Sequence, residues 1–241
     1  LGDISKEIIR KCYTEALRLQ KIFNFFDKKS ELSLLNSKRK LKVSSELLNV
    51  IEKAIEMSKL TNGEYDITLG SKILQRKKGE PIKETSSSYR DIKINFNEIS
   101  LKNKDVLIDL GSIAKGYITD RLGEFLKKEG IDCFVIDSRG DILVSGDKDY
   151  LIGIQHPREN KILFEIKLNN ETVATSGDYN QFDKTFDKSH ILNQKEIISL
   201  TVIAPTLEEA DAYATALFVA TEKERNKLIK GNKNIRVLII N

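Results

Sequence analysis

The order of strand-like and helix-like segments is the feature that most limits the folds open to this chain. Alternating apolar residues and turn signals predict short strands at residues 91–95, 98–102, 105–109, 132–137, 141–145, 150–155, 162–168, 171–176, 198–204 and 235–240. Helical spacing predicts longer helices at residues 4–26, 44–60, 112–129 and 206–220. A polar turn and a short helical turn are expected over FDKKSELSLLN, residues 26–36. Because the strands come in groups between the helices, an α+β fold is favoured over a doubly wound parallel sheet. We expect one domain over residues 1–241, with mixed or antiparallel sheets and packed helices. Residues 71–90 are expected to form an exposed polar excursion, and residues 180–196 a loop with a short strand.

The composition is that of a soluble globular protein, since 40% of the 241 residues are hydrophobic and 32% are charged. A net charge of +4 without a polybasic stripe predicts no nucleic-acid partner. Cys12 and Cys133 form no disulfide framework, and no CxxC pair or histidine cluster suggests zinc. No apolar run approaches the length of a membrane span. The chain starts at Leu1 without a signal peptide, so we expect a trimmed or processed chain whose missing start could have held an export signal.

The stretch IAPTLEEADAYATALFVA, residues 203–220, combines a core helix with an unexpected charge. Thr206 and Glu209 form a capping box, and the apolar residues that follow recur at helical spacing. Asp211 points into this apolar stripe, where an ionised carboxylate is costly unless it is paired or binds a metal. Thr215 lies one turn further along the same face, and a carboxylate with a hydroxyl suits Mg²⁺. A structural buried carboxylate is the alternative, and from this helix alone it is the commoner case.

The stretch VLIDLGSIAKGYITDRL, residues 106–122, predicts a strand that ends at Asp109, turns through Gly111 and enters a helix with Lys115 and Gly116. Backbone N–H groups at a helix start favour phosphate, and Lys115 adds a positive charge. The segment is neither a Walker A loop nor a GxGxxG motif. An ordinary strand-to-helix turn therefore explains it about as well as a phosphate site does.

Three other segments are weaker candidates. TNGEYDITLG places Tyr65 between Glu64 and Asp66, where an aromatic ring and its polar edge could be held, although a plain turn into a strand is the alternative. VATSGDYNQF, residues 173–182, is a strand running into small residues that either leave room for a ligand or simply form a turn. His190 is one of two histidines, and a lone histidine is more often structural than catalytic.

Together these segments resemble one family. The ordered motifs SELSLLN, NGEYDIT, DLGSIAKGYITDRL, GDILVSG, VATSGDY, SHIL and VIAPTLEEADAYATAL are similar to those of the ApbE family of flavin transferases (FAD:protein FMN transferases). The resemblance runs from about residue 25 to residue 220, and the DLGSIAKG block and the Ala-Asp-x-x-x-Thr helix are its most diagnostic parts.

The resemblance implies a Mg²⁺-dependent enzyme that cleaves FAD, attaches FMN to a Thr or Ser hydroxyl of an acceptor protein and releases AMP. It implies a metal site made by Asp211, Thr215 and the backbone carbonyl of Ser112, with Asp211 and His190 catalytic and His190 as the candidate base. It assigns FAD binding to Phe26, Glu64, Tyr65, Asp66, Asp109, Lys115 and Leu192. Family acceptors are often membrane redox subunits and members are commonly exported lipoproteins, so an extracytoplasmic location, periplasmic or membrane-anchored, is expected.

The chain departs from the family pattern at three places. After SHIL, residues 193–196 read Asn-Gln-Lys-Glu where the family usually continues Asp-Pro-x-Thr-Gly. Arg139 replaces the first glycine of the usual Gly-Gly-Asp, so its side chain is expected either to point out of the turn or to contact the ligand. The family's first strand is missing or altered at Leu1. The shortened loop leaves two alternatives open: an FAD pyrophosphatase giving FMN and AMP, and a flavin-binding protein without turnover.

Overall fold

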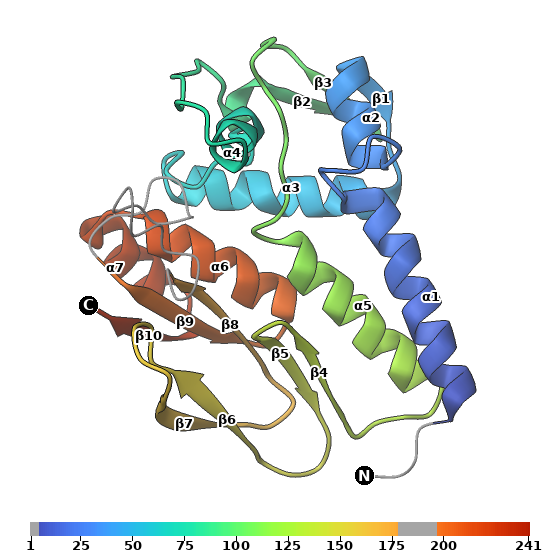
Figure 1. The fold of residues 1–241 in the computed structure, drawn as a ribbon, viewed down its shortest axis with the longest axis vertical. Coiled ribbons are helices and arrows are strands. Elements are labelled where there is room, and N and C mark those ends of the chain that lie inside the picture. Colours follow the sequence, from blue (N-terminus) through green and yellow to red (C-terminus); the bar gives the residue numbers. More distant parts are fainter. Residues whose placement is uncertain (1–4, 178–196) are drawn as a thin grey trace. The chain divides into compact units, whose positions relative to one another are not determined.

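The computed structural model describes residues 5–177 and 197–241 (Figure 1). The chain forms two compact units: residues 14–114, and residues 1–13 together with 115–241. We refer to them as the 14–114 unit and the 115–241 unit. Both combine helices with antiparallel sheets, which confirms the α+β prediction. That the two units act as one domain stays a prediction.

The 14–114 unit contains a three-stranded antiparallel sheet with the strand order β1-β3-β2. Its elements are most of α1 (Lys6–Phe23), α2 (Glu31–Lys38), β1 (Lys40–Lys42), α3 (Ser45–Leu60), α4 (Gly70–Lys77), the 3₁₀ turn η1 (Tyr89–Asp91), β2 (Ile92–Asn95) and β3 (Glu98–Leu101). The hydroxyl of Ser44 accepts the N–H of Leu47 (3.2 Å) and so caps α3, which decides between Ser44 and Ser45, the two candidates for the cap in the sequence. Gly63 follows α3 in the left-handed region (φ 91°), where glycine is favoured.

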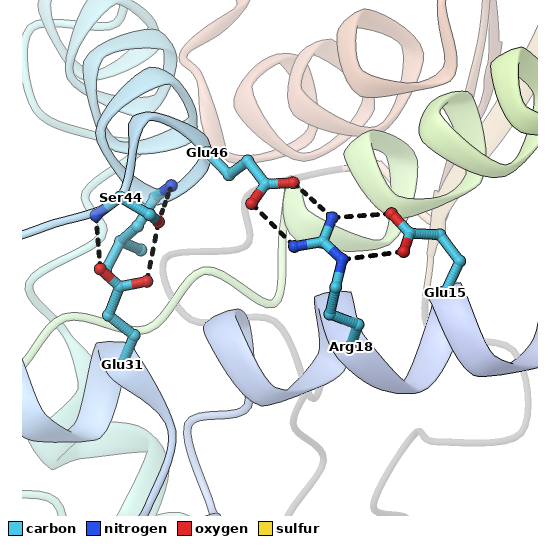
Figure 2. A network of polar contacts seen from close by, with 6 residues as sticks. Glu15, Arg18, Glu31, Ser44 and Glu46 are labelled. Carbon is cyan, nitrogen blue, oxygen red and sulfur yellow. Dashed lines mark hydrogen bonds and ion pairs between the residues drawn. The ribbon is translucent and has the colours of Figure 1, made fainter.

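Half-buried carboxylates join helices of this unit (Figure 2). The Arg18 guanidinium on α1 donates to both oxygens of Glu15 (2.8 and 2.7 Å) and to both oxygens of Glu46 on α3 (3.0 and 2.7 Å). Hydrogen bonding to Arg18 lowers the pKa of Glu15. The Glu31 carboxylate, at the start of α2, accepts the N–H and the hydroxyl of Ser44 (2.5 and 2.7 Å). Glu46 therefore connects α3 to α1, and Glu31 connects α2 to the N-cap of α3, whereas Glu15 holds Arg18 from within α1.

Residues 105–109, predicted as a strand, form only an isolated parallel bridge between Leu69 and Leu107. Backbone hydrogen bonds also join Leu107 and Asp109 to residues 67–70, and a side chain pairs the other edge of the segment. The amide of Asn36 donates to the carbonyl of Ile108 and accepts its N–H, both at 2.8 Å. Because this amide satisfies buried backbone groups that a longer strand partner would otherwise pair, the segment stays extended without forming a ladder.

The 115–241 unit contains a five-stranded antiparallel sheet with the order β10-β9-β8-β5-β4 and a separate β6-β7 hairpin. Its elements are α5 (Ala114–Lys128), β4 (Phe134–Ser138), β5 (Asp141–Ser145), β6 (Tyr150–Gln155), β7 (Ile162–Leu168), β8 (Thr172–Gly177), β9 (Ser199–Ala204), α6 (Leu207–Val219), α7 (Glu222–Gly231) and β10 (Arg236–Ile240). Every residue of β9 is buried, as expected of a strand with both faces covered.

The two faces of the five-stranded sheet pack against different elements. Helix α6 lies along β8 and β9 (Figure 1). The opposite face packs against the β6-β7 hairpin through an apolar cluster of Val144, Ile154, Leu168, Val173 and Ile203. Because side chains alternate along a strand, Asp141 of β5 and Ser176 of β8 point to the face that α6 covers.

The remaining predicted strands and helices agree with the structure to within a few residues, but four elements are not predicted: β1, α4, η1 and α7. The expectation of an exposed excursion over residues 71–90 is wrong for its first part, which forms α4. Both missed helices are short, rich in charged residues and poor in apolar ones, so they give no extended apolar pattern. The prediction for residues 180–196 lies outside the described residues. Within the described ranges, no helix has the length and apolar character needed to cross a membrane.

Candidate active site

The start of α5 places Lys115 beside a buried carboxylate. Lys115 is the second residue of the helix, directly after the turn that the sequence predicts. Its ammonium forms an ion pair with Asp141 at the start of β5. The Asp141 side chain is only 4% exposed. Its second oxygen accepts the N–H of Thr175 on β8 (3.3 Å). A carboxylate buried this far depends on such partners, so Lys115 and Asp141 act as one unit.

Asp211 on α6 is buried, with 5% of the residue exposed, as its place in the apolar stripe predicts. Among the described residues it accepts a hydrogen bond from the N–H of Gly116 on α5 (3.2 Å). Burial raises the pKa of Asp211, while the charge of Lys115 and the Gly116 hydrogen bond act in the opposite direction. Burial outweighs its compensation, which is typical of a carboxylate kept for binding or catalysis.

Gly116 is the point of closest approach between α5 and α6. A Cβ atom on Gly116 would lie 2.6 Å from the carbonyl carbon of Leu207 and 2.7 Å from the Cα atom of Glu208. No side chain fits in that space, so the glycine lets the two backbones meet. The same approach brings the Gly116 N–H to Asp211.

Thr215 lies one turn after Asp211 and is half-buried. Its hydroxyl shares a hydrogen bond with that of Ser176 on β8 (3.1 Å). Carboxylate and hydroxyl oxygens are hard ligands, which Mg²⁺ takes together with waters and substrate phosphates. The donor set and the incompletely compensated charge of Asp211 therefore fit a divalent cation. In the described part of the chain, no three His, Cys, Asp or Glu side chains gather as a metal site, so such a cation would also need hydroxyl, carbonyl or substrate oxygens.

Sequence reasoning missed Asp141. It lies in the GDILVSG motif, but the motif alone indicates no role for it. The available signal is a carboxylate that opens an apolar strand directly after a tight turn. Arg139, in that turn, is exposed and has a φ of 61°, a conformation that the glycine it replaces adopts without strain. The exposure of Arg139 agrees with a side chain that points out of the turn, and its contact with a ligand stays a prediction.

The 14–114 unit holds Tyr65, Asp109 and Ser112. The Ser112 hydroxyl donates to the phenolic oxygen of the buried Tyr65 (2.8 Å). Asp109 accepts the N–H of Gly111 (2.8 Å) within its own turn, and burial raises its pKa. The structure thus brings Tyr65 and Ser112 together, and it uses Asp109 to shape the turn that leads into α5.

Asp66 has a structural role among the described residues. Its carboxylate accepts the N–H of Thr68 (2.8 Å) and the N–H of Tyr89 (2.9 Å), and so joins two segments of the unit. Burial raises the pKa of Asp66, although both hydrogen bonds oppose the shift. These two hydrogen bonds satisfy the half-buried carboxylate within its own unit.

The other predicted FAD-binding residues are more open. Glu64 is half-buried. Phe26 is 53% exposed, and the ammonium of Lys77 lies 3.6 Å from the centre of its ring. An aromatic ring left this accessible can still stack on a planar ligand. His190 and Leu192 lie outside the described residues.

The sequence of the whole chain matches one known family. The model of the ApbE family matches residues 3–239. The chain belongs to the ApbE family. Of the predicted site residues, the 115–241 unit holds Lys115, Asp211 and Thr215, and the 14–114 unit holds Phe26, Glu64, Tyr65, Asp66, Asp109 and Ser112.

Curated ApbE relatives are similar over most of the chain. The FAD:protein FMN transferase of Haemophilus influenzae is 28% identical over 253 residues, which cover 89% of this chain and 72% of that protein. The FAD:protein FMN transferase of Vibrio cholerae is 29% identical over 246 residues, which cover 89% of this chain and 73% of that protein.

Solved ApbE structures share the fold. The flavin transferase ApbE from Vibrio cholerae has a TM-score of 0.84 at 25% identity, covering 98% of this chain and 85% of that one. The ApbE protein from Thermotoga maritima has a TM-score of 0.86 at 26% identity, covering 97% of this chain and 86% of that one. The similarity therefore extends over both units.

Proposed function

We propose that this chain is an FAD:protein FMN transferase, which moves FMN from FAD to a hydroxyl of an acceptor protein and releases AMP. Membership of the ApbE family and the activity for which its relatives are named support the proposal. The observation that carries it is Asp211, a buried and incompletely compensated carboxylate that lies one turn from Thr215 and near Lys115. A protein that merely stores flavin has no need of this charge.

The proposed reaction is a phosphoryl transfer without redox change. The acceptor hydroxyl oxygen forms a bond to the FMN-side phosphorus of the pyrophosphate. The bond from that phosphorus to the bridging oxygen breaks, and the bridging oxygen leaves with AMP. The hydroxyl proton passes to a base. Negative charge is spread over the phosphate oxygens during this step, so positioned cations stabilise the transition state.

We assign the metal to Asp211 and Thr215, with the backbone carbonyl of Ser112 added on the family resemblance. A bound Mg²⁺ supplies charge neutralisation on the pyrophosphate oxygens. Lys115 binds the same phosphates, and Asp141 fixes the position of its ammonium. This pairing makes Lys115 a positioned cation rather than a mobile surface lysine.

The remaining assignments rest on the resemblance. FAD binding is proposed for Phe26, Glu64, Tyr65, Asp66, Asp109 and Leu192. His190 is proposed as the base, because an unperturbed histidine, with a pKa of about 6.5, is mostly neutral at pH 7 and can accept the acceptor's proton.

The deciding experiment incubates the purified protein with FAD and Mg²⁺, with and without a protein that carries a Thr flavinylation motif. The proposed function predicts a covalent FMN adduct of the acceptor together with AMP, and little turnover when the acceptor is omitted. Free FMN with AMP, formed equally well without acceptor, would instead identify an FAD pyrophosphatase, which the short segment 193–196 favours. Unchanged FAD would indicate a binding protein and end the proposal.

We also propose that the enzyme acts outside the cytoplasm, on a membrane redox subunit whose flavin is attached through Thr or Ser. This proposal rests on the family resemblance alone. Cell fractionation of the native host, with antibodies against this chain, tests it directly. Recovery of the protein only with cytoplasmic markers would contradict it.

A further inference from the structure

A carboxylate on α5 holds the start of α6, and no role in the proposed site has been given to it. Asp120 accepts the N–H of Leu207 through Oδ1 (2.9 Å) and the N–H of Glu208 through Oδ2 (2.8 Å). These are the first two residues of α6, whose N–H groups have no partner within their own helix. Asp120 thus supplies a bidentate cap to a helix in which it does not lie.

This cap is added to a local one. The hydroxyl of Thr206, the N-cap residue of α6, accepts the N–H of Glu209 (3.3 Å). A side-chain cap of this kind is the usual way in which a helix start is stabilised. The contacts of Asp120 do something different, because they tie the end of α6 to a defined turn of α5.

A second carboxylate spans the same pair of helices in the opposite direction. Asp211 on α6 accepts the N–H of Gly116 on α5. Gly116 and Asp120 are one turn apart on α5, and Leu207 and Asp211 are one turn apart on α6. The two contacts are therefore neighbours, on either side of the close approach that Gly116 permits. We call this pair of contacts the α5–α6 clasp.

We propose that Asp120 is a positioning residue, which fixes the register of α6 against α5 and thereby holds the Asp211 carboxylate at the Gly116 N–H. Misplacing a group of the active site by about 1 Å lowers the reaction rate roughly 10²-fold. This catalytic consequence rests on the proposed function. The positioning itself rests only on the clasp.

The energetics of Asp120 agree with a positional role. Burial raises the pKa of Asp120 to about 6, although the N–H groups of Glu208 and Leu207 oppose the shift. The ionised form present at neutral pH is therefore less favourable in the folded protein than in the unfolded chain. The carboxylate is better explained by where it holds α6 than by any gain in stability.

Amide hydrogen exchange at Gly116 tests the positioning without reference to activity. Gly116 lies in the first turn of α5, so its N–H depends on Asp211 for protection. We expect Asp120→Ala to raise its exchange rate at least about tenfold above that of the matched control Thr206→Ala, which removes only the local cap of α6. Equal exchange rates in the two variants would overturn the inference, whatever their activities. If Asp120→Ala does not fold, Asp120→Asn, which keeps one acceptor oxygen, carries the same comparison with a smaller expected difference.

The Mg²⁺ dependence then tests the catalytic consequence. In the presence of FAD, Asp120→Ala should need about tenfold more Mg²⁺ than the wild type for half of the thermal stabilisation and for half-maximal FMN transfer. Thr206→Ala should stay within about twofold of the wild type in both, even if it melts earlier. An unchanged Mg²⁺ requirement in Asp120→Ala would contradict the catalytic consequence of the positioning, while leaving the proposed function intact. A wild type that neither responds to Mg²⁺ nor transfers FMN would sink the proposed function, while the exchange result still decides the positioning.

Discussion

Carboxylates connect two pairs of helices in this protein, with opposite energetics. Between α1 and α3, Glu15 and Glu46 bind Arg18 at a surface where all three side chains are a quarter to a half exposed (Figure 2). Between α5 and α6, Asp120 and Asp211 accept backbone N–H groups with no cation in direct contact among their described hydrogen bonds and ion pairs. In the α1–α3 contact, hydrogen bonding to Arg18 lowers the pKa of Glu15. In the α5–α6 contact, burial raises the pKa of both Asp120 and Asp211.

The opposite pKa shifts distinguish a contact that stabilises the protein from a contact that serves its function. A carboxylate whose pKa is lowered on folding stabilises the protein at neutral pH, and one whose pKa is raised does the reverse. The α1–α3 contacts therefore need no explanation beyond a modest stabilisation. The α5–α6 clasp costs stability where the protein is expected to work, and a cost of this kind is typical of functional sites. Substitutions in the two regions should therefore differ in whether they lower the stability of the protein or its activity.

The largest expected effect is that of Asp211→Asn. The amide keeps an oxygen for the Gly116 N–H but loses the negative charge, so metal-dependent FMN transfer should fall about 10³-fold or more. Thermal stability should be unchanged or higher, because a buried charge has been removed. FMN transfer and melting temperature are measured on the same preparation, with the exposed Asp132→Asn as control. Transfer at the wild-type rate in Asp211→Asn would end its assignment to the metal.

Gly116→Ala should disrupt the α5–α6 clasp by steric overlap. The added methyl group meets the Leu207 backbone, which cannot move aside as a flexible side chain would, so we expect a loss of about 3 kcal/mol in the free energy of unfolding. Gly231→Ala is the matched control, because Gly231 also lies in a terminal turn of a helix but has nothing within 4 Å of the added atom. Denaturant unfolding of both variants measures the difference. Similar stabilities in the two would mean that α5 and α6 are not in close contact at Gly116.

The pH dependence of stability sharpens the comparison further. Because the pKa of Asp120 is raised from 3.8 to about 6 on folding, the folded protein binds more protons than the unfolded chain between these values. The stability contributed by the protonated form is complete below about pH 4 and is lost as the pH rises through 6, a change of about 3 kcal/mol. Arg121 opposes this shift and Glu124 adds to it.

Asp120→Asn does not titrate, and therefore isolates the contribution of Asp120. The free energy of unfolding of the wild type, measured from pH 4 to pH 7.5, should fall relative to that of Asp120→Asn as the pH rises. A difference between the two proteins that stays constant with pH would show that Asp120 is not buried as an ionised group.

The sequence predicts Asp211 and the helix around it because one charge interrupts a regular apolar stripe, and the structure confirms that burial. The close approach at Gly116 was less visible, since a glycine in a helix start is equally compatible with a ligand. Asp120 and Asp141 could not be found from spacing, because each takes its meaning from partners far along the chain: Leu207 and Glu208 for one, Lys115 for the other.

The same limit applies to the fold. Helices with an apolar face, such as α3, are predicted to within a few residues, because their periodicity is local. The charged helix α7 carries its own start signal, a capping box of Thr221 and Glu224, yet has too few apolar residues for a periodic pattern. The segment around Ile108 reads as a strand but is completed by the side chain of Asn36, a partner 72 residues away. Local pattern cannot reveal such a contact.

The smallest effect is expected where the charges are most numerous. Arg18→Met removes four hydrogen bonds to Glu15 and Glu46, yet the free energy of unfolding should fall by less than about 1 kcal/mol, because exposed ion pairs gain little over hydration. The loss should shrink further in 1 M salt, where screening acts within about 3 Å. FMN transfer should not change, in contrast to the transfer expected of Asp211→Asn and Asp120→Ala. Urea unfolding at low and high salt measures the effect. A loss of several kcal/mol that persists in high salt would show that the α1–α3 contact contributes strongly to stability. The exposure of its side chains would then not explain how it differs from the α5–α6 clasp.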